Sequence, residues 1–186
     1  MKLHPLVLPL AAGVAVVAGM AFLAGCADMP VGNRAVPQPA RDVDIKAYAG
    51  LWYEIGRYEN RFERDCEAVT ASYSLSDDGR IDITNSCRSG GLDGREKVAH
   101  GKAKVVPDSG NAKLKVSFFG PFYVGNYWVL DHAPDYSWSI VGEPSGRYLW
   151  ILSRVAHPDP ATRAMIDTRV RQLGYDQSLI RPTLQP

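Results

Sequence analysis

The sequence has few of the residues that usually build active sites and metal centres. His100, His132 and His157 are scattered along the chain, and no pair of histidines stands at a metal-ligand spacing. The nucleophile motif Gly-x-Ser-x-Gly is absent. Asp77 and Asp78 are adjacent in a turn, so a solvated hairpin tip explains them better than a catalytic dyad. We therefore expect no catalytic residues, no metal site and no cofactor.

An excess of charge of either sign is also lacking. The chain has 21 lysines and arginines against 20 aspartates and glutamates, a formal net charge of +1. Nucleic-acid binding needs a concentrated positive field, so we exclude nucleic acid as a partner. The same balance gives no support to electrostatic steering of a charged substrate.

A long uncharged segment is present only at the start of the chain. Lys2 and His4 precede an apolar run of 18 residues, 6–23, which leads into Leu-Ala-Gly and Cys26. A basic start, an apolar stretch and small residues before a cleavage point are typical of a secretory signal. The run is long enough to span a bilayer, so a retained transmembrane anchor is the alternative.

The residues before Cys26 resemble the lipobox of bacterial lipoproteins. That resemblance implies cleavage before Cys26, diacylation of its thiol and acylation of its new amino group. Several acyl chains give a stable membrane anchor where one would be marginal. Ala27, rather than aspartate, follows the cysteine, which resembles the pattern for sorting to the outer membrane. We therefore expect a signal peptide over residues 1–25, a lipidated cysteine with a proline-rich tether over 26–42, and one domain over 43–186.

The two other cysteines, Cys66 and Cys87, predict a disulfide. An even pair in an exported, oxidising compartment favours a bridge. The segments around them alternate apolar and polar residues, with the turn signal Ser-Asp-Asp-Gly between them, as in a β-hairpin. In such a hairpin, the sequence numbers of two opposed residues would add up to about 155, and those of Cys66 and Cys87 add up to 153. A one-residue bulge next to Gly79 would absorb most of this offset, so we expect the two cysteines to face each other. A reactive thiol at Cys66, flanked by Arg64 and Asp65, is the alternative.

Most of the chain reads as short strands separated by turns rich in glycine, proline and aspartate. We expect eight strands, at residues 50–58, 69–75, 80–87, 96–106, 112–118, 123–130, 136–143 and 148–153. Short connections favour an up-and-down meander, and eight such strands avoid exposed edges by closing into a barrel. The fold class is therefore all-β, an eight-stranded antiparallel up-and-down barrel.

One helix is expected after the strands. Asp159 suits its N-cap, Pro160 its first turn and Gly174 the position after its end. Apolar residues recur at helical spacing between them. We expect this helix, about 160–173, to pack on the outside of the barrel.

Three motifs resemble the lipocalin family, in particular its bacterial outer-membrane branch. "GLWYEIGRY" resembles the Gly-x-Trp block of the first strand, with Gly50 and Trp52 in the defining places. "YLWILSR" resembles the last-strand block that ends in arginine, here Arg154, and "KVSFFGPFYVGNYWVLD" resembles the same region of the bacterial proteins. The middle signature of many lipocalins, Thr-Asp-Tyr, is absent as such. The resemblance implies that Trp52 fills the closed end of the barrel under the guanidinium of Arg154, a structural role.

The resemblance also implies a function. It implies a small hydrophobic ligand, a fatty acid or lysophospholipid, bound in the barrel of a lipid-anchored protein for storage or transport in membrane maintenance. The location would be the outer membrane of a Gram-negative bacterium, with the domain in the periplasm and a homodimer possible. The alternatives are an enzyme on the same barrel, which would need a free Cys66, and a pigment or haem binder.

Strand alternation suggests which side chains line the site. Glu54 shares a strand face with Trp52 and is expected to point inward, either as a hydrogen-bonded carboxylate or as a group that orients the ligand. The candidate ligand contacts are aromatic residues: Tyr73, Phe118, Tyr123, Tyr127 and Trp138.

Overall fold

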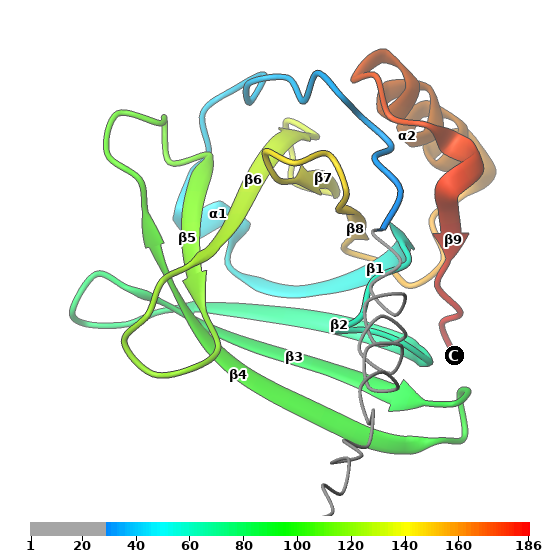
Figure 1. The fold of residues 1–186 in the computed structure, drawn as a ribbon, viewed down its shortest axis with the longest axis horizontal. Coiled ribbons are helices and arrows are strands. Elements are labelled where there is room, and N and C mark those ends of the chain that lie inside the picture. Colours follow the sequence, from blue (N-terminus) through cyan, green and yellow to red (C-terminus); the bar gives the residue numbers. More distant parts are fainter. Residues whose placement is uncertain (1–28) are drawn as a thin grey trace, which may run out of the picture.

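The fold is that of a computed structural model, which describes residues 29–186 (Figure 1). The expected signal peptide and the lipidation of Cys26 lie outside the described residues. Among residues 29–186, no helix has the length and apolar character needed to cross a membrane.

All eight expected strands are present. They are β1 (Gly50–Tyr58), β2 (Cys66–Leu75), β3 (Ile81–Ser89), β4 (Arg95–Val105), β5 (Lys113–Ser117), β6 (Gly125–His132), β7 (Trp138–Gly142) and β8 (Leu149–Ser153). Each pairs antiparallel with the next, and β1 pairs with both β8 and β2, which closes the barrel. The expectation of an eight-stranded up-and-down barrel is confirmed.

The two ends of the barrel differ. A short helix, α1 (Ile45–Tyr48), precedes β1 and lies at one end, together with the turns that follow β2, β4 and β6. Asp44 caps α1 by accepting from the backbone N–H groups of Lys46 and Ala47. The loops that follow β1, β3, β5 and β7 lie at the other end, which we call the mouth.

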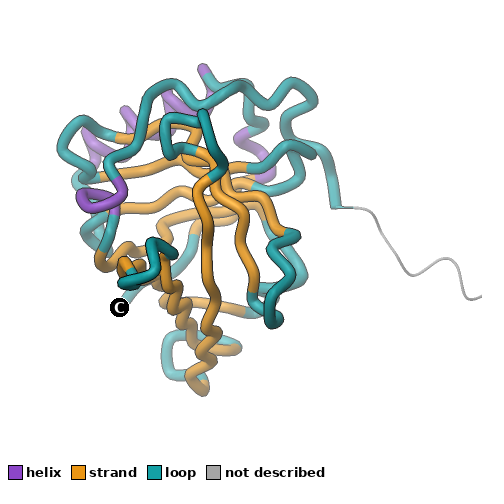
Figure 2. The backbone as a smooth tube through the Cα atoms, turned by 90° about the vertical axis from the view of Figure 1, so that its left-hand side faces the viewer, coloured by secondary structure: helices purple, strands orange, loops and turns teal. Residues whose placement is uncertain are grey.

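Two apolar clusters lie on opposite faces of the barrel wall. The inner cluster includes Trp52, Tyr73, Ile83 and Leu152, and fills the end near α1. The outer cluster joins β6–β8 to Ile166 of helix α2 (Pro160–Gln172). Helix α2 therefore packs outside the barrel, as expected, and Figures 1 and 2 show it beyond the curved layer of strands.

The hairpin of β2 and β3 carries the disulfide Cys66–Cys87. The prediction of the bridge is confirmed, and the hairpin has the register that its turn predicts, but the two cysteines do not face each other directly. Cys66 lies opposite Ser89, and the bulge falls between Glu67 and Thr70 rather than next to Gly79. The bridge therefore joins positions that are not directly opposed, with Cα atoms 5.5 Å apart. The enzyme alternative depended on a free Cys66, and this bond removes that basis.

A segment after α2 completes the wall of the barrel, which the sequence patterns did not predict. Strands β1 and β2 pair only over Gly50–Tyr53 and then separate. On the same edge of β1, strand β9 (Ile180–Pro182) pairs with Gly56–Tyr58. Gln185 follows β9 and donates to the carbonyls of Glu54 on one side and Val69 on the other. Residues 180–185 thus fill the seam between β1 and β2.

The proline-rich segment before β1 has a more definite place than a tether requires. Gly32 and Asn33 donate backbone hydrogen bonds to the carbonyl of Gly146, in the loop after β7. The buried Asn33 side chain donates to the carbonyl of Leu173 at the end of α2, over 2.9 Å. From residue 29 onward, the chain is therefore held against the barrel.

Candidate ligand-binding site

The floor of the barrel is built around Trp52. Its indole is fully buried, and its Nε1 donates to the carbonyl of Tyr48 in α1 over 2.8 Å. The guanidinium carbon of Arg154 lies 3.8 Å from the ring centroid, in cation–π geometry. A small void of about 10 Å³ remains beside α1, room for one water molecule at most. The floor is therefore packed, and a ligand inside the barrel would have to lie above it.

A chain of four hydroxyl groups lies on this floor. The hydroxyl of Tyr127 is 2.9 Å from those of Tyr73 and Tyr48, and the hydroxyl of Tyr48 is 3.0 Å from Ser139 Oγ. Burial raises the pKa of Tyr48 to about 12 and also raises the pKa values of Tyr73 and Tyr127, so all three phenols are neutral. Four hydroxyl protons serve three hydrogen bonds, so one of the four hydroxyl groups keeps a proton to donate.

The wall above the floor carries a buried ion pair. Glu54 and Arg57 are almost fully buried, and Arg57 Nη1 lies 2.8 Å from Glu54 Oε1. Arg57 also donates to the carbonyls of Glu63 and Cys66, and Thr183 donates to Glu54. A bulge between Glu54 and Gly56 turns Arg57 inward, because it places Arg57 opposite Trp150, which packs against the inner cluster.

The protonation of Glu54 is unusual. Burial raises the pKa of its carboxyl well above the ordinary value of 4.5, and the nearby charge of Glu63 adds to the shift. Arg57 and Thr183 oppose the shift by stabilising the ionised form. A carboxyl that gains a proton this readily can change from acceptor to donor when its surroundings change.

Aromatic rings lead from the ion pair to the mouth. Trp150, Tyr148 and Phe62 form a stack with centroid separations of 5.5 and 6.1 Å, and Trp150 Nε1 donates to Glu63 over 2.8 Å. Across the barrel, β4 is exposed on both faces over residues 95–100, whereas Ala103 is fully buried. The inner face of the sheet is thus packed near α1 and open toward the mouth.

Four buried polar atoms have no hydrogen-bond partner among the described residues, on Arg57, Asn85, Tyr175 and Gln185. Two of them, Arg57 Nε and Asn85 Oδ1, belong to side chains on the inner face of the barrel. Asn85 lies opposite Ala71, which packs against the inner cluster, so Asn85 faces the interior. Buried polar atoms are nearly always paired in proteins, so an unpaired donor and an unpaired acceptor on the inner face favour polar groups of a ligand as their partners.

The structure brings together some of the sequence-predicted contacts and separates others. Tyr73 and Tyr127 share the floor, and Glu54 points inward as expected. Phe118 lies against the inner side of β4, where a Cβ on Gly101 would come within 2.7 Å of its ring. Tyr123 lies outside, with Lys104 Nζ 4.3 Å from its ring centroid.

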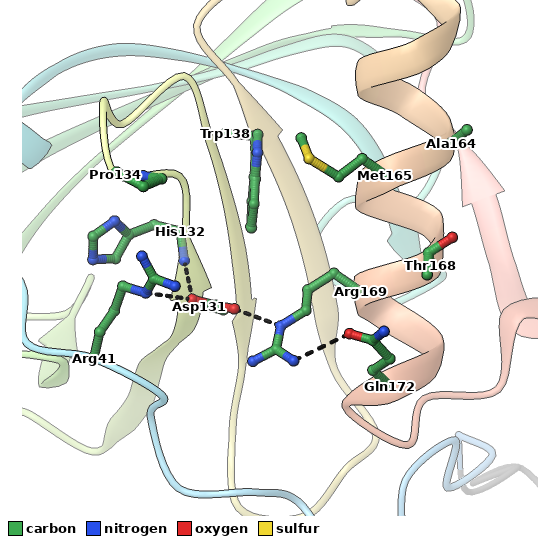
Figure 3. Close-up of a pocket in the computed structure, with 10 residues that line it drawn as sticks. All are labelled: Arg41, Asp131, His132, Pro134, Trp138, Ala164, Met165, Thr168, Arg169 and Gln172. Atoms are coloured by element: carbon green, nitrogen blue, oxygen red, sulfur yellow. Dashed lines mark hydrogen bonds and ion pairs between the residues drawn. The ribbon is translucent and has the colours of Figure 1, made fainter.

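The expectation that Trp138 faces the ligand is wrong in its placement. Its ring belongs to the outer cluster under α2, because β7 is buried on both faces and Trp138 takes the helix side. There it lines a pocket of about 620 Å³ outside the barrel (Figure 3). At the centre of this pocket, the buried Asp131 pairs with Arg41 at 2.9 Å and with Arg169 of α2. These ion pairs join the segment before β1, strand β6 and helix α2, so we assign them a structural role.

Sequence reasoning missed Arg57, Glu63, Asn85 and Trp150. Strict alternation from Trp52 directs Arg57 outward, and no sequence signal marks the bulge that reverses it. Trp150 could have been found, since it alternates with Leu149 and Ile151, both in the outer cluster. No group of three or more potential metal ligands gathers within residues 29–186.

Comparison with known proteins gives consistent matches. A family model described as "Lipocalin-like domain" matches residues 43–185. The outer membrane lipoprotein Blc of Escherichia coli K12 is 40% identical over 167 residues, which cover 89% of this chain and 92% of that protein. The protein of the same name from Vibrio cholerae is 42% identical over 159 residues, covering 83% and 88%. Among solved structures, the cockroach allergen Per a 4 matches with a TM-score of 0.64 and 20% identity, over 83% of this chain and 96% of the allergen, a likeness of fold alone.

Proposed function

The chain belongs to the lipocalin family, and from this premise we propose that it is an outer-membrane lipoprotein that binds a fatty acid or lysophospholipid in its barrel. Cys26 would carry the acyl chains that anchor it, with the domain in the periplasm. Its role would be lipid storage or transport in membrane maintenance. The relatives named outer membrane lipoproteins support the location.

The main support for a ligand with an acyl chain and a polar headgroup is that the inner wall is apolar except for a few buried polar side chains. The inner face is aromatic and aliphatic, which suits an acyl chain. Within it lie one buried arginine and the unpaired Arg57 Nε and Asn85 Oδ1. An acidic headgroup would meet Arg57, and a hydroxyl or ammonium donor of the ligand would meet Asn85. We place Phe118, Tyr73 and Tyr127 along the acyl chain, with Trp150 beside the headgroup.

Native mass spectrometry of the purified mature protein tests the ligand class. We expect co-purified fatty acid or lysophospholipid, and micromolar binding of either to the emptied protein. An empty protein that binds neither would refute the proposal. A visible absorbance band after purification would favour the pigment or haem alternative instead.

A pair of arginine variants tests the headgroup contact. Arg57→Gln should weaken binding of a fatty acid more than binding of the uncharged monoacylglycerol of equal chain length, because only the acid uses the guanidinium. Arg171→Gln, on the exposed surface of α2, is the matched control. Should Arg57→Gln fail to fold, Asn85→Ala tests the same region through the lysophospholipid headgroup. Equal losses for the acid and the monoacylglycerol would rule out the contact.

A further inference from the structure

The loop between β5 and β6 exposes more apolar surface than its surroundings. This apolar loop, residues 118–124 with the sequence FFGPFYV, contains no charged residue. The side chains of Phe119, Phe122 and Val124 are 84%, 70% and 81% exposed. Phenylalanine and valine are usually buried, and exposed groups of them mark sites of interaction.

The loop that exposes these side chains is held in place by its own contacts. Ser117 Oγ donates to the carbonyl of Gly120 over 3.0 Å, and Gly120 takes the left-handed φ of 63° that the turn requires. Phe118 packs against Gly101 inside the barrel, and Tyr123 packs on Lys104 outside it. These two rings hold the loop on both sides of the wall, while the side chains of Phe119, Phe122 and Val124 are left in solvent.

The apolar loop lies at the mouth, and the first described residues are held at the same end. Arg147, in the loop after β7, donates to the carbonyl of Met29 over 2.9 Å. In Figure 1 the apolar loop is the yellow-green loop at the lower left, below the labels β5 and β6, and the described chain starts in dark blue near the label β1. Three residue steps separate Met29 from Cys26, which is at most about 10 Å of extended chain. Acyl chains on Cys26 would therefore hold the mouth end close to the membrane surface.

We propose that the apolar loop inserts into the lipid bilayer and turns the mouth of the barrel toward the membrane. This inference rests on the lipid anchor of the proposed function. Across the mouth, the exposed Phe62 lies under Arg61, with the guanidinium carbon 5.1 Å from the ring centroid. A bilayer supplies hydrocarbon for the phenylalanines and phosphate for Arg61, so we assign this surface to lipid rather than to a second copy of the chain.

Spin labels on the mature lipoprotein test the orientation. One nitroxide label is placed at Phe122→Cys in the apolar loop, and the matched control is placed at Lys46→Cys, an exposed position of α1 at the opposite end. The protein is reconstituted into vesicles of phosphatidylethanolamine and phosphatidylglycerol. We expect the label at 122 to become accessible to oxygen and shielded from a water-soluble nickel chelate, while the label at 46 stays open to the chelate.

Three other outcomes would overturn the inference. Equal exposure of both labels to the chelate, on protein that floats with the vesicles, would refute docking and leave the anchor intact. Protein that does not float would refute the anchor and the docking with it. Shielding of label 122 from both reagents, with a doubled particle mass, would assign the apolar loop to a second copy of the chain.

Ligand transfer gives a second, functional readout. The double variant F119S/F122S should slow transfer of a fluorescent fatty acid from vesicles to the protein by about tenfold or more, because less apolar surface engages the bilayer. Its affinity for the same fatty acid in water should stay unchanged. The control Val155→Ser, which alters an exposed apolar side chain outside the loop, should leave the rate unaltered. An unchanged transfer rate in F119S/F122S would contradict the proposal.

Discussion

Trp52 and Arg154 donate to the same carbonyl oxygen, that of Tyr48. The indole Nε1 lies 2.8 Å from it and Arg154 Nη2 lies 3.2 Å from it. Arg154 also donates to the carbonyls of Ala47, Ala49 and Leu51. The two side chains thus satisfy the carbonyl end of α1, a helix too short to do so itself.

This shared acceptor predicts that Trp52 and Arg154 are coupled in stability. Trp52→Ala should lower the free energy of unfolding by about 3–5 kcal/mol, and Arg154→Ala by about 2–3 kcal/mol. The double variant should cost less than the sum of the two single variants, because each leaves the other without its partner. Urea unfolding of the four proteins measures the cycle. Loss of ligand affinity in Trp52→Ala at an unchanged melting temperature would contradict the structural role.

The disulfide predicts a measurable loss of stability on reduction. Cys66 and Cys87 are 21 positions apart, and a loop of that size corresponds to about 3 kcal/mol in the chain-entropy description. Unfolding in urea with and without a reductant should show this difference. The double serine variant should match the reduced protein and should not respond to the reductant.

We expect the ion pairs of Asp131, in the pocket under α2, to stabilise the fold. Asp131→Asn should lower the free energy of unfolding by about 2 kcal/mol, because Arg41 and Arg169 then face each other without the carboxylate between them. The control is Asp167→Asn, whose carboxylate pairs with Arg163 on the half-exposed surface of α2 and should cost under about 0.5 kcal/mol. Equal losses of stability in the two variants would show that burial of Asp131 does not strengthen its ion pairs.

Because the pKa of Glu54 is raised, we expect the stability of the protein to depend on pH. Its pKa is raised by burial, so above pH 4.5 the folded chain holds a proton that the unfolded chain has released. The contribution of this carboxyl to stability therefore falls as the pH rises from 4.5 toward the raised pKa. The free energy of unfolding of the wild type, relative to Glu54→Gln, should decrease from pH 4.5 to pH 7. A constant or increasing difference would show that the ion pair with Arg57 outweighs burial.

The strands and the helix were predictable because their patterns are local. Turn signals separate the strands, and Asp159 and Pro160 mark the start of α2 in the sequence as they do in the structure. The residues that point into the barrel were harder to predict, because the alternation of apolar and polar residues shows which side chains point inward only where one face of the strand is polar. Strand β7 is buried on both faces, so its pattern contains no information about the side that Trp138 takes.

Two features of the site depend on contacts that no local pattern records. The bulge in β1 turns Arg57 inward and is visible only in its pairing with β8. The seam is filled by Ile180–Pro182 and the residues after it, a run too short to show a strand period. Only pairing with β1, more than a hundred positions earlier, gives that run its structure.

The filled seam has a consequence for the order in which the protein can fold. Eight strands are made before α2, yet the gap between β1 and β2 stays open until residues 180–185 arrive. Until then, Glu54 lacks Thr183, and an edge of β1 lacks its partner. Because pairing over such a sequence distance forms more slowly than local hairpins, we expect β9 to join the sheet late, and until it does the uncovered edge of β1 can pair with another chain.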